Sequence, residues 1–157
     1  MATKVGIIVL SGTLDKAMPA FIIGTTAAAM GMEVGMFFSF YGLNVIHKEK
    51  MKNLKVSPVG NPAMPIPVPQ IFTILPGMMD FATAMMKDMM KKHKVPSIEE
   101  LINQAKELDV KLYPCQMAMS LFGYKEEDLI DGLQKPAGAA TFLNFVNAGE
   151  KSLILNF

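Results

Sequence analysis

Apolar runs alternate with helical patterns along the chain, which is typical of an α/β protein. An aliphatic run from Lys4 to Leu10 predicts a first strand that is buried on both faces, as strands of parallel sheets are. Glu33 to Ser39 is a second such run. Because one helical pattern separates the two runs, they predict a βαβ unit with parallel strands. Further strands are predicted at Val110 to Tyr113 and Ser152 to Leu155, with Leu54 to Val59 as another candidate.

Helical patterns fill the stretches between these runs. The first helix is expected to start near Asp15, because Pro19 fits only around a first turn, and Gly31 supplies its C-terminal cap. Its body carries no charged residue, so other groups must cover it on most sides. Ser97 and Glu100 form a capping box that opens a later helix. Further helices are predicted from Gly77 to Lys92, Gln116 to Gly123 and Ala137 to Ala148.

The order of these elements predicts one α/β domain over residues 1–157. A chain of this length normally has a single hydrophobic core. Strands that alternate with helices form three layers, with helices on both faces of a mainly parallel sheet. Because 51% of the residues are hydrophobic and 18% are charged, an intrinsically disordered chain is excluded.

An uncharged stretch from Val56 to Met79 is long enough to cross a bilayer, but its composition opposes a helix. Its first half contains Pro58, Pro62, Pro65, Pro67 and Pro69. We therefore predict an extended apolar segment from Val56 to Pro76, covered by the core, a partner subunit or a membrane surface. The methionines and phenylalanine of the next helix would also suit peripheral membrane contact, together with the nearby Lys87, Lys91, Lys92 and Lys94.

Charge and cysteine content exclude several classes of function. The formal net charge is +1, and the 15 basic residues are all lysines, so arginine, the usual residue for bidentate phosphate or guanine contacts, is absent. A nucleic-acid partner is therefore not expected. One cysteine and two histidines cannot form a disulfide framework or a four-ligand zinc site, and we expect no metal and no cofactor. The N-terminal apolar run is too short for a secretory signal, which predicts a cytoplasmic protein.

Cys115 is the candidate catalytic residue. It lies between a predicted strand end and a predicted helix start, and open α/β sheets place their sites at the carboxyl ends of strands. A helix that starts near Gln116 would stabilise the thiolate, and we expect the thiol at the surface edge of the sheet. A single thiolate can accept a sulfane sulfur and pass it to another thiol. The alternative is that Cys115 is a small buried hydrophobic residue.

Two loops are predicted to reach the same sheet edge as Cys115. Ser11, Gly12 and Thr13 follow the first strand, and Tyr41 and Gly42 follow the second. Neither loop has a phosphate-binding motif, and an ordinary βα turn explains the first loop equally well. We treat these residues as candidates for substrate binding, together with Gln116.

Three stretches of the chain resemble the DsrE/DsrF-like sulfur-transfer proteins, in the longer branch often labelled peroxiredoxin-like. They read SGTLDKAMPAFIIGTTAAAMGMEVGMFFSFYGL, NPAMPIP and PCQMAMSLFG, and the similarity covers nearly the whole chain. The resemblance implies a three-layer α/β/α fold with a mainly parallel, five-stranded sheet, and an oligomeric assembly. It also implies a cysteine that carries a persulfide or thiosulfonate, which maps onto Cys115. It does not imply peroxidase activity.

Two functional hypotheses follow from these features. The first is a sulfur carrier or sulfurtransferase that takes sulfur from a small inorganic donor onto Cys115 and passes it to a sulfur-relay acceptor protein. The second is a non-enzymatic oligomeric scaffold or membrane-surface adaptor, in which Cys115 is a buried structural residue. In both cases we expect a homo-oligomer, because a monomer would expose a large apolar surface.

Overall fold

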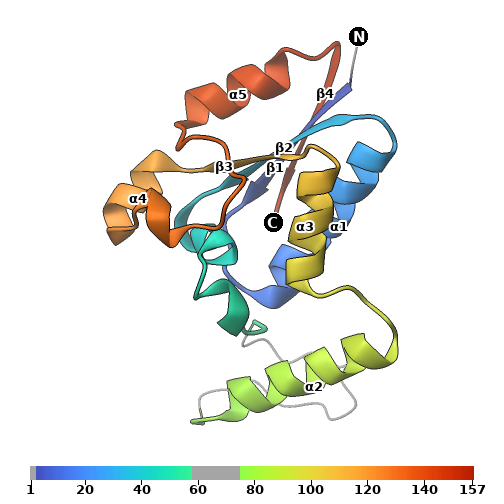
Figure 1. Ribbon diagram of the computed structural model, residues 1–157, viewed down its shortest axis with the longest axis vertical. Helices are drawn as coiled ribbons and strands as arrows, with labels where there is room; N and C mark the ends of the chain where they lie inside the picture. Colours follow the sequence, from blue (N-terminus) through green and yellow to red (C-terminus); the bar gives the residue numbers. More distant parts are fainter. Residues whose placement is uncertain (1–2, 58–74) are drawn as a thin grey trace.

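Strands and helices alternate along the chain, as the hydrophobic pattern predicted (Figure 1). The computed structural model describes residues 3–57 and 75–157. Three short 3₁₀ helices are interspersed among the main elements: η1 (Phe40–Ile46), η2 (Met51–Asn53) and η4 (Glu126–Asp128). The main elements are β1 (Thr3–Val9), α1 (Leu14–Ala29), β2 (Glu33–Phe38), α2 (Met78–Lys92), α3 (Ile98–Glu107), β3 (Lys111–Pro114), α4 (Gln116–Phe122), α5 (Ala139–Asn147) and β4 (Lys151–Asn156).

The predicted parallel sheet is confirmed, with a different number of strands. Its order is β3-β2-β1-β4, and every neighbouring pair is parallel. In this register Val5 of β1 lies between Val34 of β2 and Leu153 of β4. Five strands were expected, and the described residues form four. In the candidate strand Leu54 to Val59, residues 54–57 have no regular structure and the remaining two lie outside the described residues.

The outer edge of β3 is partly covered by the segment that leads into α5. Gln134 donates its N–H to the Leu112 carbonyl and Ala137 donates to the Pro114 carbonyl, both at 2.9 Å. Cys115 and Ala137 form a single parallel bridge. Because neither Pro114 nor Pro136 has a backbone N–H, the ladder is interrupted at this edge, and the segment pairs with β3 without becoming a strand.

Helices pack on both faces of the sheet (Figure 1). On one face, Gly24 of α1 lies close to Ile7 and Met36, where a Cβ would be 3.3 Å from the Ile7 Cδ1 atom and 3.4 Å from the Met36 sulfur. On the other face, Gly6 lies beneath Phe142 of α5 and Gly35 lies beneath Phe145. Successive strand residues point to opposite faces, so Gly6 and Ile7 face different helices. Small residues in the strands and in α1 therefore allow close helix–sheet contact.

The first helix differs from its prediction at the N-terminus. α1 begins at Leu14, so Pro19 is the sixth helical residue and lies inside the helix instead of in its first turn. The proline leaves the Asp15 carbonyl without its helical donor, and this position is exposed to water. α3 packs across α1, so part of the cover expected for the uncharged helix comes from the same chain.

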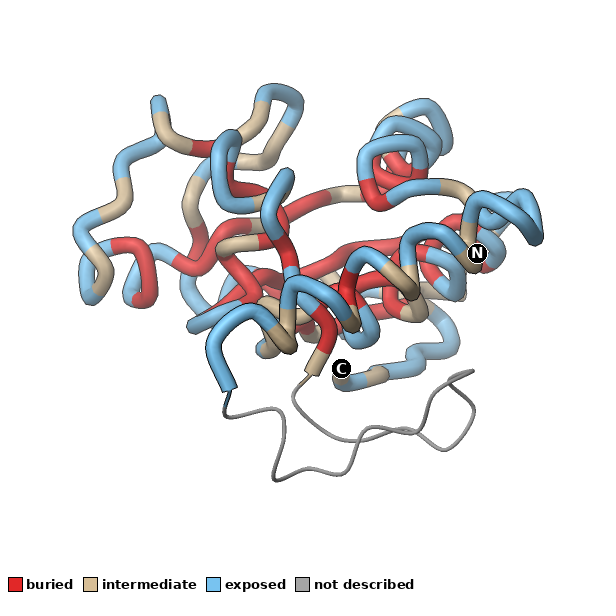
Figure 2. Tube along the Cα trace, turned by 90° about the horizontal axis from the view of Figure 1, so that it is seen from below, coloured by how far each residue is buried: buried red, intermediate tan, exposed pale blue. Residues whose placement is uncertain are grey.

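The predicted helix from Gly77 to Lys92 is confirmed as α2, which lies apart from the sheet at the bottom of Figure 1. Thr83 is its one buried residue. Buried positions instead follow β1, β2, β3 and the helices packed on the sheet, whereas no residue of β4 is buried (Figure 2). Within residues 3–57 and 75–157, no helix combines the length and the apolarity that spanning a bilayer requires. Most of the predicted extended segment from Val56 to Pro76 lies outside the described residues.

Candidate functional site

The chain turns sharply after β2, and Gly42 makes this turn possible. Its N–H points to the Leu10 carbonyl at 3.0 Å and to the Ser39 carbonyl at 2.9 Å. A Cβ at this position would overlap the Val9 carbonyl, so only glycine fits. As a result, η1 lies against the end of β1 at the carboxyl edge of the sheet.

The loop of Ser11, Gly12 and Thr13 lies at the same edge. The Ser11 and Thr13 hydroxyl oxygens are 3.0 Å apart, and Ser57 donates its hydroxyl to Thr13 Oγ1 at 3.3 Å. A Cβ on Gly12 would come within 2.5 Å of the Tyr41 carbonyl oxygen. The structure therefore places the two loops singled out by the sequence side by side.

Cys115 lies between β3 and α4, as the sequence predicted. Its N–H donates to the Phe38 carbonyl at 2.9 Å, which fixes the residue beside the end of β2. Cys115 is only 4% exposed, so the expected surface position of the thiol is wrong. The next residue, Gln116, is exposed and donates its N–H to the Ala137 carbonyl at 3.1 Å. The Gln116 N–H is therefore already bonded to the segment that pairs with the outer edge of β3.

A short helix follows Cys115, and a partly buried tyrosine precedes it by two residues. α4 has seven residues, so its dipole is that of about two turns. Cys115 is the N-cap of this helix and makes no side-chain capping hydrogen bond. Two residues before it, burial raises the pKa of Tyr113, while the positive charges of Lys111 and Lys4 lower it by a smaller amount. Tyr113 is therefore a neutral hydroxyl near neutral pH.

An aromatic contact joins η1 to the end of α4. The rings of Tyr41 and Phe122 are stacked with centroids 5.9 Å apart, and Tyr41 is 64% exposed. Phe122 in turn lies 5.7 Å from the ring of Tyr124. Phe122 and Tyr124 were not singled out by the sequence analysis. The contact of Phe122 with Tyr41 arises because β2 and β3 are neighbours, which no local sequence signal reports.

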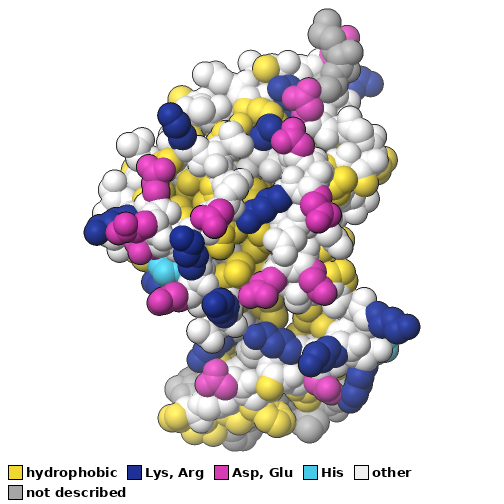
Figure 3. Space-filling model, in the orientation of Figure 1, with side chains coloured by type: hydrophobic (Ala, Val, Ile, Leu, Met, Phe, Trp, Pro, Cys, Tyr) yellow, Lys and Arg dark blue, Asp and Glu magenta, His cyan; other side chains and the backbone are white. Residues whose placement is uncertain are grey.

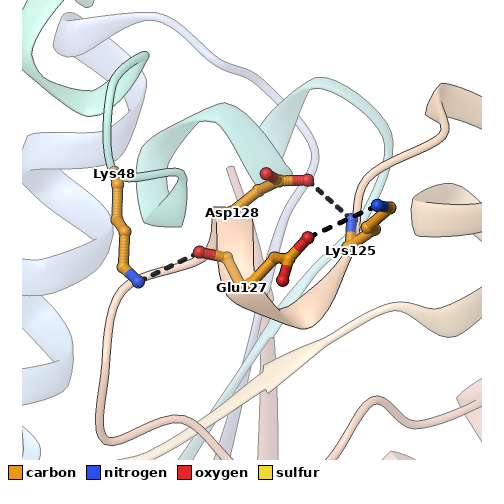
Figure 4. Close-up of polar contacts among 4 residues, drawn as sticks. All are labelled: Lys48, Lys125, Glu127 and Asp128. Carbon is orange, nitrogen blue, oxygen red and sulfur yellow. Dashed lines mark hydrogen bonds and ion pairs between the residues drawn. The ribbon is translucent and has the colours of Figure 1, made fainter.

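Polar contacts join the basic segment after η1 to the turn that follows α4. Tyr124 donates its hydroxyl to Asn44 Oδ1 at 2.8 Å. Figure 4 shows Lys48 donating to the Glu127 carbonyl at 3.0 Å, while the Lys125 N–H donates to the Asp128 carboxylate at 2.8 Å. These contacts hold η1 and the chain after α4 together around the candidate site.

Two hollows lie at the surface of the described residues near this edge and α2, and Cys115 lines neither of these two. One has a volume of about 460 Å³ and includes Gly12 and Thr13 with Asn44. The second, of about 1120 Å³, lies between α2 and the start of α3. The site residues predicted from the sequence thus gather at one sheet edge, with the thiol beneath the surface.

The fold and this sheet edge define a class of protein. The chain belongs to the DsrE/DsrF/DrsH-like family, whose model matches residues 1–154, and this confirms the resemblance seen in the sequence. It is 46% identical over 158 residues to the sulfur carrier protein DsrE2 of Allochromatium vinosum, covering 97% of this chain and 96% of that protein.

Two other proteins are similar to this chain, one in sequence and one in structure. The uncharacterized protein YrkE of Bacillus subtilis is 34% identical over 152 residues, covering 95% of this chain and 94% of that protein. The crystal structure of the ychN protein from E. coli aligns over 100% of both chains with a TM-score of 0.57 and 9% sequence identity. The latter comparison shows a shared fold.

Proposed function

We propose that this protein carries sulfur on Cys115 and passes it to the thiol of a partner protein. The observation that supports this most is the position of the chain's one cysteine between β3 and α4, in a protein 46% identical to a sulfur carrier. One cysteine cannot form a disulfide within the chain, so the chemistry is that of a single thiol. Six further residues shape the donor site: Ser11, Gly12, Thr13, Tyr41, Gly42 and Gln116.

Atoms and electrons balance in both the loading and the release of sulfur, so neither step needs an external oxidant. The Cys115 thiolate attacks a central sulfur of tetrathionate, the new S–S bond forms, and thiosulfate leaves. A polysulfide donor would instead leave one sulfane sulfur on Cys115 and depart as a shorter chain. In release, the partner thiolate attacks the sulfane sulfur attached to Cys115, and Cys115 leaves as a thiolate. The reducing cytoplasm expected from the sequence would keep both thiols available.

Burial of Cys115 sets a condition on this proposal and favours a second candidate function. A residue that is 4% exposed must become accessible before a donor can reach its sulfur. Local opening at the β3–α4 junction would provide that access. If the junction stays closed, Cys115 is a structural residue, and the protein is an oligomeric scaffold or membrane-surface adaptor.

Mass spectrometry of the intact protein distinguishes the two functions. The folded protein is exposed separately to polysulfide, thiosulfate and tetrathionate under anaerobic conditions. We expect one adduct of sulfane sulfur or thiosulfonate on the wild type and none on Cys115→Ser. Cys115→Ser places a hydroxyl at a buried position and should cost about 1–3 kcal/mol of stability, but its circular dichroism spectrum should still match that of the wild type, because the fold is retained.

Labelling of the thiol provides the matched control for access. An alkylating reagent is compared on the folded protein and on the protein unfolded in urea. If the folded wild type gains no adduct from any donor while the unfolded protein is alkylated, the carrier function is wrong and the scaffold is favoured. An adduct on the folded protein that transfers to a small acceptor thiol, with return of the original mass, supports the carrier.

We also propose that the protein is a homo-oligomer. Leu153 and Ile154 of the edge strand β4 are 50% and 49% exposed, and Ile22 of α1 is 42% exposed. A strand edge with exposed apolar residues favours association with a second copy. Light scattering at micromolar concentration should give a mass above that of the 17.2 kDa chain. A monomer that sediments with anionic vesicles at low salt would favour peripheral membrane contact instead.

A further inference from the structure

The larger hollow lies away from Cys115 and combines an apolar floor with a basic lining. Its volume is about 1120 Å³, compared with roughly 300–1,000 Å³ for typical small-molecule sites. Its apolar lining includes Met51 of η2, Leu54 directly after η2, Met90 of α2 and Val95. Leu54 is 4% exposed, which makes it part of the core at the base of the hollow. This space can hold an aliphatic chain.

Four lysines line the same hollow: Lys52, Lys87, Lys91 and Lys94. In the part of the chain that the structure describes, none of these four forms an ion pair, and residues 58–74 contain no acidic residue. Figure 3 shows lysine side chains gathered over α2, where the molecule narrows. The four ammonium groups are therefore available to an anionic ligand.

Three carboxylates also line the hollow, and two of them are already engaged. Asp88 lies 2.7 Å from Lys92, a lysine outside the lining. The Glu100 carboxylate accepts the Ser97 N–H at 2.6 Å in the capping box of α3. Glu99 is the third. Because Asp88 is already paired with Lys92, two carboxylates remain against the four lysines, so the lining carries a net positive charge and favours an anion.

We propose that this hollow binds an anionic amphiphile, with its acid group among the lysines and its aliphatic chain on the apolar floor. A small inorganic anion would leave the floor unused, and a cationic amphiphile would be repelled. Methionine side chains such as Met51 and Met90 adapt to chains of different shape. The site is separate from Cys115, so it goes beyond the proposed sulfur transfer and does not depend on it.

Calorimetric titration of the full-length protein tests this site. Decanoate, kept below its micelle concentration, represents a free fatty acid, and monomeric dihexanoylphosphatidylglycerol represents a membrane lipid. Decyltrimethylammonium is the control with opposite charge. We expect saturable binding of at least one anionic probe and none of the cation. Which anionic probe binds identifies the source of the ligand.

Variants of α2 locate the binding. Lys91→Gln should weaken binding about fivefold, as expected for one partly exposed charge contact. Lys135→Gln is the control, because Lys135 is exposed, forms no ion pair among the described residues and does not line the hollow. Ala84→Phe should abolish binding, because Ala84 lines the hollow and the larger ring would occupy it. Thermal unfolding checks that each variant is folded.

The proposal is wrong if neither anionic probe gives a saturable titration. It is also wrong if binding is unchanged in both Lys91→Gln and Ala84→Phe, since the probe would then occupy another surface. Equal losses in Lys91→Gln and Lys135→Gln would indicate nonspecific attraction to positive charge, and would likewise overturn it. Cys115→Ser should bind the probes as the wild type does, so a failed sulfur-transfer experiment leaves this test intact.

Discussion

Two helices of nearly equal length, α1 with 16 residues and α2 with 15, use their apolar residues in different ways. α1 buries eight residues against the sheet and α3, whereas α2 buries Thr83 alone. The six methionines of α2 are all half-buried. The apolar content of a helix therefore does not by itself indicate how deeply the helix is buried.

The difference follows from side-chain size and charge. α1 has no charge after Lys16, and Gly24 lets its backbone approach Ile7 and Met36 closely. α2 carries lysines toward its C-terminus, and long methionine side chains hold its backbone away from the body of the protein. Small residues thus favour a tightly packed helix, whereas Met and Lys favour a helix with space beneath it.

Two polar contacts attach α2 to the chain before it, in addition to the packing of Met86 and Met90 against the core. The Thr83 hydroxyl accepts the Val56 N–H at 3.2 Å and donates to the Met79 carbonyl at 2.7 Å. Asp80 pairs with Lys55 at 2.8 Å, but both side chains are at least half exposed, so this pair contributes less than about 1 kcal/mol. Thr83 is therefore the more important of the two attachments.

The largest expected effect comes from a matched pair of phenylalanines. Phe21 of α1 is fully buried and lies 5.8 Å from the ring of Phe38, whereas Phe81 of α2 is 51% exposed. Phe21→Ala should lower the free energy of unfolding by about 3–5 kcal/mol, because it leaves a cavity in the core. Phe81→Ala should cost less than about 1 kcal/mol. Urea unfolding followed by far-ultraviolet circular dichroism measures both. Equal losses would show that α2 is packed as tightly as α1.

A smaller loss of stability is expected when the Thr83 hydroxyl, which attaches α2 to the preceding chain, is removed. Thr83→Val keeps the shape of the side chain and leaves the buried Val56 N–H without its acceptor, which should cost about 1–3 kcal/mol. Thr83→Ser is the control, because it retains the hydroxyl. Hydrogen exchange at the Val56 amide should accelerate in Thr83→Val and stay near the wild-type rate in Thr83→Ser. Equal rates in all three proteins would contradict the attachment through Thr83.

Elements with strong local signals could be predicted from the sequence. The central strands appear as apolar runs because both of their faces are buried, as the consecutive buried residues Val34 to Phe38 of β2 illustrate. The start of α3 was predicted because Ser97 and Glu100 supply both halves of the capping box. The position of Cys115 between β3 and α4 followed from the same local reasoning.

Features that depend on contacts between distant segments could not be predicted. The segment beside β3 contains Gln134, Lys135 and Pro136, so it has no apolar run to mark it as a sheet edge. The burial of Cys115 and the stacking of Tyr41 on Phe122 both depend on β3 lying next to β2. Local sequence patterns determine where a strand or helix begins, but not which distant segment covers it.

The smallest expected change in stability lies at the junction between α2 and α3, which is held by exposed hydrogen bonds of the capping box. Neither Thr13 before α1 nor Gly77 before α2 makes a side-chain capping bond, but α3 has a complete capping box. Hydrogen bonds from the Ser97 backbone, and then from its side chain, hold the pKa of Glu100 below its ordinary value of 4.5. The folded protein therefore favours the carboxylate more than the unfolded chain does.

This lowered pKa gives stability a pH dependence with a defined sign. The contribution of Glu100 is present above pH 4.5 and is lost as the pH falls through the lower pKa of the folded state, because the unfolded chain binds the proton more readily. Glu100→Gln should therefore flatten the loss of stability on acidification below pH 4.5, measured by urea unfolding at a series of pH values. Glu99→Gln is the control, because it removes a neighbouring exposed charge outside the capping box. If the free energy of unfolding of Glu100→Gln falls with pH as steeply as that of the wild type, the carboxylate does not stabilise the start of α3. Apolar contacts would then hold the junction between α2 and α3 in place.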